Sequence, residues 1–347
     1  MSTTTPYAGA RGVHCLAIPT PFAVGRVNCY LIDDEPLTLL DAGPNSGTSL
    51  TALEAALGEH GRRVEDLERI VVTHQHIDHI GLLDILAKRS GAEVCALDHL
   101  APWLANYKRE MEANDSFSAE IMLRNGIPQD VTYALRTVSA SFRAWGASAQ
   151  VTRQLAEGEL LQFASRAWRV LFRPGHSPSD TVFFDEASGE LFGGDHLIKH
   201  ISSNPLISRP LESLPAGTVN AGEKKTSLEG EVGERPRALM IYMDSLRATQ
   251  EMELEVVYAG HGVPVEDHRK LIDERMKMHD RRANKLYTLI AERPRSAYEL
   301  AQEMWGNVAV TQAFLTLSEV LGHVDVLIDE GRVRELKVDG VTSFQAT

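Results

Sequence analysis

The chain has 347 residues, a hydrophobic fraction of 43% and a formal net charge of −13 at pH 7. This length predicts about two domains, and the apolar fraction is sufficient for a buried core. The acidic balance argues against a surface built for nucleic acid or for an anionic membrane, because both partners require a basic footprint.

Cysteine usage and the N-terminal sequence predict the compartment. Cys15, Cys29 and Cys95 form no C-x-x-C pair, which favours a reducing environment. Residues 1–15 lack a basic segment followed by an apolar one, so we expect no signal peptide. No apolar run reaches the length of about 18 residues that a membrane span requires. We therefore expect a soluble, cytoplasmic protein.

The first part of the chain alternates predicted strands and helices. Residues 12–41 consist of short apolar runs between turn residues, which indicates a β meander or a pair of hairpins. Residues 48–58 have helical spacing, and residues 68–73 are typical of a buried strand. A helix over residues 82–91 and a strand over residues 92–97 follow. Repeated strand-helix order indicates an α/β layered core.

Residues 98–150 interrupt this pattern with a block of successive predicted helices. The β pattern then resumes. The segment 202–237 is polar, rich in Gly, Pro, Glu and Lys, and has no clear period, so we expect a long loop. A helix over residues 238–252 and a strand over residues 254–260 complete a first domain, predicted to cover residues 1–265.

Residues 266–347 are predicted to form a second domain. One long helix is expected over residues 268–292, and a second over residues 296–306 begins on a Ser-x-x-Glu capping box. A third helix is expected over residues 311–331, followed by a hairpin over residues 333–345. Three helices and a hairpin are typical of a winged-helix module.

Residues able to bind a metal follow several predicted strands. The stretch VVTHQHIDHIG places three histidines and an aspartate within six positions, directly after a predicted buried strand. Burying polar groups this densely is costly unless a cation satisfies them. Strand ends in an α/β fold share one rim, where sites are usually built, so these side chains are expected to converge. The strand-end residues are Asp41, His74, His76, Asp78, His79, His176, Asp195 and His261.

The spacing divides these residues into two adjacent ligand sets. His74 and His76 point the same way in an extended segment, because side chains alternate along a strand. Asp78 and His79 fall where the chain turns into a helix, so they are aimed at a neighbouring point, and Asp195 is able to bridge the two points. The first set is His74, His76 and His176, and the second is Asp78, His79 and His261.

Imidazole and carboxylate ligands without thiolates favour two divalent ions, Zn above all, with Fe and Mn as alternatives. Two such ions about 3.5–4 Å apart form a recognised hydrolytic device, in which a bridging hydroxide attacks a polarised electrophile. Asp78 and Asp195 are expected to position this hydroxide. Asp41 is expected to orient a ligand histidine by accepting its other N–H.

These motifs have the order and chemistry of a known family. LLDAG, THQHIDH, PGHSPSD, FGGDH and AGHG, spread over residues 41–261, resemble the five motifs of the metallo-β-lactamase superfamily. The resemblance implies an αβ/βα sandwich of two mixed sheets flanked by helices, with a dinuclear site at one edge and Asp195 bridging. The tail resembles the winged-helix extension of lactamase-like hydrolases, and the 98–150 block resembles an insertion that some members place over the active site.

The substrate is less determined than the chemistry. Without an export signal we do not expect a true β-lactamase. Glyoxalase II-like, thioesterase and lactonase activities all place an acyl carbon of a small molecule before the metal-activated water. Apolar residues of the 98–150 block either line an acyl pocket or pack the inserted helices together. They are Trp103, Tyr107, Met111, Phe117, Met122, Tyr133, Phe142 and Trp145.

Endoribonuclease-like phosphodiester hydrolysis is the alternative, because related winged-helix members include endoribonucleases and two metals suit this reaction. The predicted recognition helix, Thr311–Glu330, contains no Lys or Arg but several acids, which phosphate would repel. We therefore expect neither a nucleic-acid nor a membrane partner. The tail is interpreted as a wall of the substrate pocket or as a homodimer contact.

Overall fold

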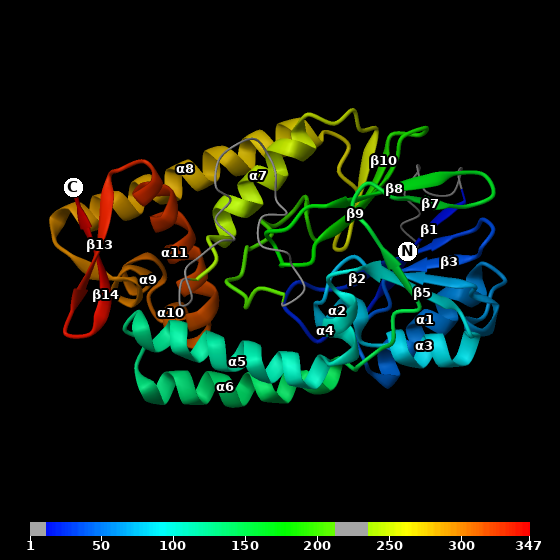
Figure 1. Ribbon diagram of the computed structural model, residues 1–347, viewed down its shortest axis with the longest axis horizontal. Helices are drawn as coiled ribbons and strands as arrows, with labels where there is room; N and C mark the ends of the chain where they lie inside the picture. The colour runs from blue at the N-terminus through cyan, green and yellow to red at the C-terminus, as the bar shows by residue number, and fades with distance from the viewer. Residues whose placement is uncertain (1–11, 212–234) are drawn as a thin grey trace.

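The larger part of the chain is built around two β-sheets that pack face to face (Figure 1). The computed structural model describes residues 12–211 and 235–347. The first sheet contains, in spatial order, β1 (Val13–Ile18), β2 (Val27–Ile32), β3 (Thr38–Leu40), β4 (Arg69–Val71), β5 (Glu93–Leu97) and β6 (Arg153–Leu155). The second contains, in spatial order, β11 (Val256–Ala259), β10 (Glu190–Gly194), β9 (Thr181–Asp185), β8 (Ala167–Phe172) and β7 (Leu160–Gln162).

Strand direction brings the carboxyl ends of neighbouring strands to one edge. β3, β4, β5 and β6 run parallel, and β10 runs parallel to β11. Asp41 directly follows β3, and His74 comes three residues after the end of β4. Thr181, the first residue of β9, donates its backbone N–H to the Thr73 carbonyl, which joins the two sheets at this edge.

Helices cover the outer faces of both sheets, and one apolar core lies between the sheets. Leu39 and Val71 of the first sheet share that core with Phe183 and Phe192 of the second. The first sheet is covered by α1 (Gly47–Glu59) and α3 (Leu83–Ser90), and the second by α7 (Ala238–Gln250). This arrangement confirms the predicted αβ/βα metallo-β-lactamase sandwich.

The predicted helical block is present within residues 98–150. Its main helices are α4 (Ala101–Ala105), α5 (Tyr107–Arg124) and α6 (Gln129–Phe142). Figure 1 shows α5 and α6 running side by side from the sandwich to the C-terminal region. Ile121 and Met122 of α5 share a core with Leu317 and Leu321 of that region. The block therefore connects the two parts of the molecule.

The C-terminal region contains the expected three helices and hairpin, with one further short helix and a short strand. Glu299 and Ser296 form the expected capping box. The elements are α8 (His268–Glu292), β12 (Arg295–Ser296), α9 (Ala297–Trp305), α10 (Val308–Thr311), α11 (Ala313–Asp329), β13 (Val333–Val338) and β14 (Val341–Ala346). The strands form a third sheet in the order β12-β14-β13. Residues of α5 and α11 share one core, so packing alone does not divide the chain near residue 265. The domain boundary at that position stays a prediction.

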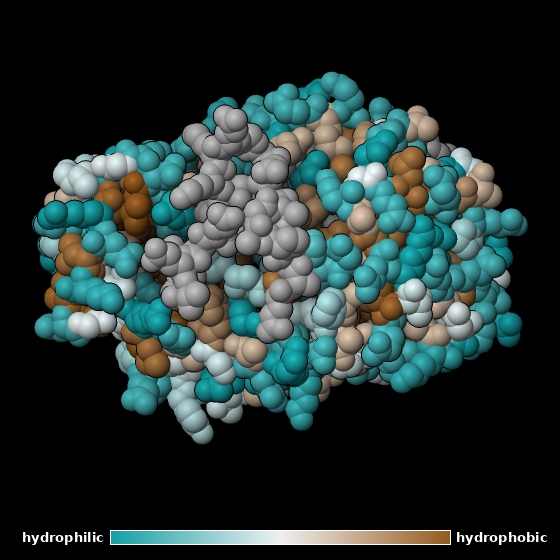
Figure 2. Space-filling view, viewed as in Figure 1, coloured by the Kyte–Doolittle hydropathy of each residue, from teal (hydrophilic) through white to brown (hydrophobic). Residues whose placement is uncertain are grey.

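The predicted loop 202–237 is only partly described. Residues 202–211 and 235–237 contain no helix or strand, and residues 212–234 lie outside the described residues. No helix in the described parts of the chain is long and apolar enough to cross a membrane. On the face shown in Figure 2, hydrophilic residues dominate and hydrophobic residues occur in small separate groups.

Candidate metal centre

The first predicted ligand set converges at the edge of the sandwich. His74 and His76 come from the segment between β4 and α2 (Ile77–Ile80), and His176 comes from the loop after β8. His76 Nδ1 lies 3.1 Å from His74 Nε2 and 2.9 Å from His176 Nε2. All three nitrogen atoms lie within 4.8 Å of one another, which is close enough for them to bind one ion.

The second predicted set lies beside the first. Asp78 and His79 are on α2, and His261 comes two residues after the end of β11. His261 Nε2 lies 3.4 Å from Asp78 Oδ2. One ligand atom from each of these residues lies within 4.8 Å of the other two.

Asp195, which directly follows β10, lies between the two sets. Its Oδ1 atom is 3.5 Å from His79 Nε2. Its Oδ2 atom is 3.5 Å from His176 Nε2 and 3.4 Å from His261 Nε2. One carboxylate thus reaches ligand candidates of both sets, as a bridging ligand must.

Hydrogen bonds behind the histidines determine which ring nitrogen faces the centre. Asp41 Oδ2 accepts from His79 Nδ1 at 2.7 Å, and the Arg26 carbonyl accepts from His261 Nδ1 at 2.7 Å. The Thr73 hydroxyl donates to Asp41 at 2.8 Å, so it accepts from His74 Nδ1 at 2.9 Å. In each neutral ring the proton is therefore on Nδ1, which leaves the Nε2 lone pair directed at the centre.

Burial keeps His74 and His76 of the first set neutral. Burial, together with the neighbouring His176, lowers the pKa of His76 to about 3. Burial, followed by the proximity of His79, holds the pKa of His74 well below its usual value. Neutral imidazoles are the form that binds metal ions, so His74 and His76 are ready to do so at neutral pH.

In the second set the pKa values of the histidines are raised rather than lowered, because these histidines face carboxylates. Burial alone would lower the pKa of His79, but the carboxylates of Asp195 and Asp41 raise it well above its usual value. Burial likewise opposes a charge on His261, yet Asp195 and Asp78 raise its pKa to about 9. Without a metal ion these carboxylates therefore attract protons onto the two histidines. A divalent cation would replace those protons.

Unsatisfied polar atoms support the fit of the centre to cations. His79 Nε2, His261 Nε2 and Asp195 Oδ1 are buried and have no hydrogen-bond partner. Leaving such atoms unsatisfied is costly, and ligation of a cation removes that cost. The nitrogen and oxygen donor set, without a thiolate, suits the divalent ions expected from the sequence.

Two glycines leave room for the centre. A Cβ atom on Gly260 would lie 2.3 Å from Asp195 Oδ1 and 2.8 Å from His79 Cε1. A Cβ atom on Gly194, whose φ is +48°, would lie 2.8 Å from Thr73 Oγ1. Only glycine allows the backbone to approach the side chains this closely.

Sequence reasoning missed several residues that support the ligands. Thr73 connects Asp41 to His74, and Ser179 accepts the Gln75 backbone N–H at 3.1 Å. Gly260 was also missed. The position of Thr73 directly before His74 was a usable signal, whereas the contact of Ser179 with Gln75 joins two sheets and leaves no local pattern.

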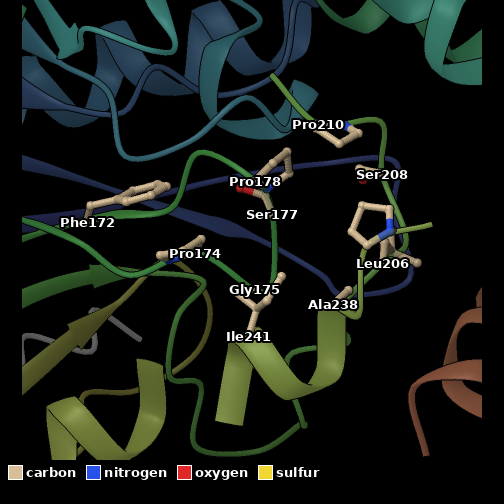
Figure 3. Close-up of a pocket in the computed structure, with 11 residues that line it drawn as sticks. Phe172, Pro174, Gly175, Ser177, Pro178, Leu206, Ser208, Pro210, Ala238 and Ile241 are labelled. Atoms are coloured by element: carbon tan, nitrogen blue, oxygen red, sulfur yellow. The ribbon is translucent and has the colours of Figure 1, made fainter. Parts of the chain in front are cut away.

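The apolar residues of the 98–150 block mostly pack against protein. Tyr107 and Met122 are buried in two different cores. Phe117 packs against the C-terminal core, while Tyr133 is 73% exposed. None of the eleven residues that line the pocket in Figure 3 comes from this block. Tyr107, Phe117 and Met122 thus follow the packing interpretation, and the acyl-pocket interpretation of the other residues stays a prediction.

The family model of the metallo-β-lactamase superfamily matches residues 23–261. The chain belongs to the metallo-β-lactamase superfamily. It is 32% identical over 315 residues to the probable metallo-hydrolase YqjP of Bacillus subtilis, covering 91% of this chain and 92% of that protein. Membership of the superfamily, with histidine and aspartate clusters able to bind metal ions, supports a metal-dependent hydrolase.

Two further similarities differ in extent. The crystal structure of a β-lactamase domain protein from Burkholderia ambifaria has a TM-score of 0.79 and 25% identity, covering 100% of this chain and 97% of that chain. The exodeoxyribonuclease WalJ of Streptococcus pneumoniae is 40% identical over 67 residues, which is 19% of this chain and 23% of that protein. The likeness to the Burkholderia structure thus extends over the whole chain, whereas the likeness to the nuclease is local.

Proposed function

We propose that this protein hydrolyses an acyl bond of a small molecule, a thioester, lactone or ester, with two divalent metal ions. The observation that carries the proposal is the position of Asp195, whose carboxylate lies within 3.5 Å of His79, His176 and His261. One carboxylate between two sets of ligand atoms is the geometry of a two-metal site. Zinc is the first candidate, with iron and manganese as alternatives.

Each residue of the centre has a defined part in this proposal. His74, His76 and His176 would hold one ion, and Asp78, His79 and His261 would hold the other. Asp195 would offer its carboxylate to both sets, and with Asp78 it would position the attacking water. Asp41 orients His79 by accepting its Nδ1 proton, and Thr73 does the same for His74.

The bound ions would lower the pKa of a shared water molecule and polarise the acyl carbonyl. In the overall reaction water adds to the acyl carbon, the bond from that carbon to the leaving sulfur or oxygen breaks, and the leaving atom takes up a proton. The carboxylates of Asp78 and Asp195 provide acceptors for the proton that the water loses.

Phosphodiester hydrolysis by the same centre is the alternative, and the WalJ match favours testing it. The charge and burial of α11 argue against it. Glu319 pairs with Arg282, and Asp325 pairs with Arg235. Leu317 and Leu321 lie in the C-terminal core, so the helix presents little basic or free surface to a nucleic acid.

The C-terminal region is proposed to be a winged-helix-like module with a structural role. Its α11 packs so closely on α7 that a Cβ atom on Gly322 would lie 2.7 Å from Leu239 Cβ. This contact supports a role in shaping the catalytic domain. A homodimer contact and a cytoplasmic location remain proposals, the latter supported by the free cysteines Cys15, Cys29 and Cys95.

Metal analysis and a substrate panel test the proposed function. Mass spectrometry is expected to find about two ions per chain, and a protein that binds none would overturn the metal assignment. The panel contains aryl esters, lactones, acyl-CoA thioesters, S-lactoylglutathione, single-stranded RNA and single-stranded DNA. Acyl hydrolysis lost in His76→Ala and kept in the exposed control His60→Ala supports the proposal. Cleavage of nucleic acid alone would replace it with the alternative.

A further inference from the structure

An apolar pocket lies against the loop that carries His176 (Figure 3). It encloses about 420 Å³ of space, part of which is open to solvent. The residues that line this pocket, named here the proline pocket, are Phe172, Pro174, Gly175, Ser177, Pro178, Leu206, Ser208, Pro210, Pro236, Ala238 and Ile241. Because Gly175 and Ser177 are the chain neighbours of His176, the pocket and the metal centre share this loop.

The wall of the pocket beside the centre is held firmly. Ser177 donates its backbone N–H and its hydroxyl to the two carboxylate oxygens of Asp180, each at 2.7 Å. Ser245 of α7 donates to the Pro174 carbonyl at 2.7 Å. A Cβ atom on Gly175 would lie 2.3 Å from Tyr242 Cα, so loop and helix are in direct contact. A substrate group in this pocket therefore meets a surface with little freedom to adapt.

The opposite wall comes from the segment 206–210, which other parts of the molecule hold in place. The Ile207 backbone N–H donates to Ser318 of α11 at 3.3 Å. The Arg209 backbone N–H donates to Asn114 of α5 at 3.0 Å. The C-terminal region and the helical block thus support the pocket from behind without lining it.

The lining selects the chemistry of the occupant. No Asp, Glu, Lys, Arg or His is among the described residues that line the pocket, and its only hydroxyl groups are those of Ser177 and Ser208. A charged group placed there would lose hydration without gaining a partner. The lining therefore suits an uncharged aliphatic group.

We propose that the proline pocket binds the acyl chain of the substrate, and that Ile241 and Leu206 on opposite walls limit its length. This inference rests on the proposed acyl hydrolysis and narrows its substrate class to unbranched aliphatic acyl esters and thioesters. The acyl carbon lies at the metal centre, and the uncharged chain extends past the His176 loop into the pocket.

Kinetics on p-nitrophenyl esters with acetyl, butyryl, hexanoyl, octanoyl and decanoyl groups test this inference on the metal-loaded full chain. For the wild-type protein, kcat/KM is expected to rise roughly fourfold with each buried methylene, up to an optimum. Ile241→Phe reduces the pocket, so it should lower kcat/KM for the best substrate about tenfold or more and move the optimum to shorter chains. Leu206→Ala enlarges the pocket and should move the optimum to longer chains.

A matched control separates pocket filling from damage to the fold. Ala248→Phe adds an aromatic ring at an exposed position two turns further along α7, and it should leave the chain-length profile unchanged. Metal content should equal that of the wild type in every variant. If the wild type, Ile241→Phe and Leu206→Ala all hydrolyse the esters with the same dependence of kcat/KM on chain length, the inference is overturned. The proposed function would still stand in that case. A wild-type protein that hydrolyses none of the esters, thioesters or lactones would overturn both.

Discussion

Asp41 Oδ2 lies 2.7 Å from His79 Nδ1, and the Asp41 backbone has a φ of +58°. The left-handed backbone of Asp41 turns the chain after β3, and this turn lets the Asp41 carboxylate reach His79 from behind α2. Its Oδ1 atom also accepts the Thr73 backbone N–H at 2.9 Å, which fixes its orientation. A strained residue held by several hydrogen bonds is typical of a functional site.

The Asp41→Asn variant tests this relationship. Asn tolerates the left-handed backbone, but its amide is a weaker, uncharged acceptor for the His79 proton. Metal affinity is expected to fall roughly 10- to 100-fold, as measured by competition with a chelator. Asp339, with a φ of +51° in the hairpin after β13, offers a matched control. Asp339→Asn should leave metal affinity unchanged, and equal affinity in both variants would contradict the orienting role.

Gly260 is the second test of the centre. In Gly260→Ala the new methyl group meets Asp195 and His79, whose closest atoms lie 2.3 and 2.8 Å away. We expect the variant to bind fewer ions than the wild type and to lose most hydrolytic activity. Gly58, near the end of α1, has no neighbouring atom within 4 Å of an added Cβ and serves as control. Mass spectrometry of both purified variants measures the number of metal ions per chain. A metal content in Gly260→Ala equal to that of the wild type would show the prediction to be wrong.

The stability of the chelated protein should depend on pH through His261. Its folded pKa is about 9, because Asp195 and Asp78 outweigh the opposing effect of burial, and its ordinary value is 6.5. Protonated His261 therefore stabilises the folded metal-free state fully below pH 6.5, and this contribution is lost as pH rises through 9. Thermal denaturation with a chelator should show Tm falling over this range. His261→Gln under the same conditions should show a smaller fall, and the same slope in both proteins would refute the assignment.

The Arg235–Asp325 pair connects the segment before α7 to α11. Arg235 donates two hydrogen bonds of 2.6 Å to Asp325, whose side chain is only 5% exposed. Asp325→Ala removes two hydrogen-bond acceptors and a paired charge from the partly buried Arg235 guanidinium, so we expect a loss of about 3 kcal/mol in the free energy of unfolding. The exposed pair of Asp244 and Arg247 provides the control, and Asp244→Ala should cost less than about 1 kcal/mol. Urea unfolding of both variants measures the difference, and equal costs would contradict a special role for the buried pair.

Much of the fold and of the candidate centre was readable from local pattern. Each ligand candidate follows an apolar run that forms a strand, so the alternation of apolar and polar segments marked the edge where side chains meet. The pairing of His74 with His76, and of Asp78 with His79, followed from their spacing at the turn into α2. The long helix α8 and the capping box of α9 were predicted for the same reason, since helical spacing and caps are local.

The sequence by itself thus determined the sandwich, its family and the residue types offered to the metal. The tertiary structure alone decided which partner each ligand has and where the apolar pocket lies. Asp41 reaches His79, and Ser318 holds Ile207, only because elements far apart in the chain pack together. Such contacts depend on how helices and sheets pack, and packing leaves no period in the sequence. The pocket beside His176 arises in the same way, from Leu206 and Ile241 on opposite walls.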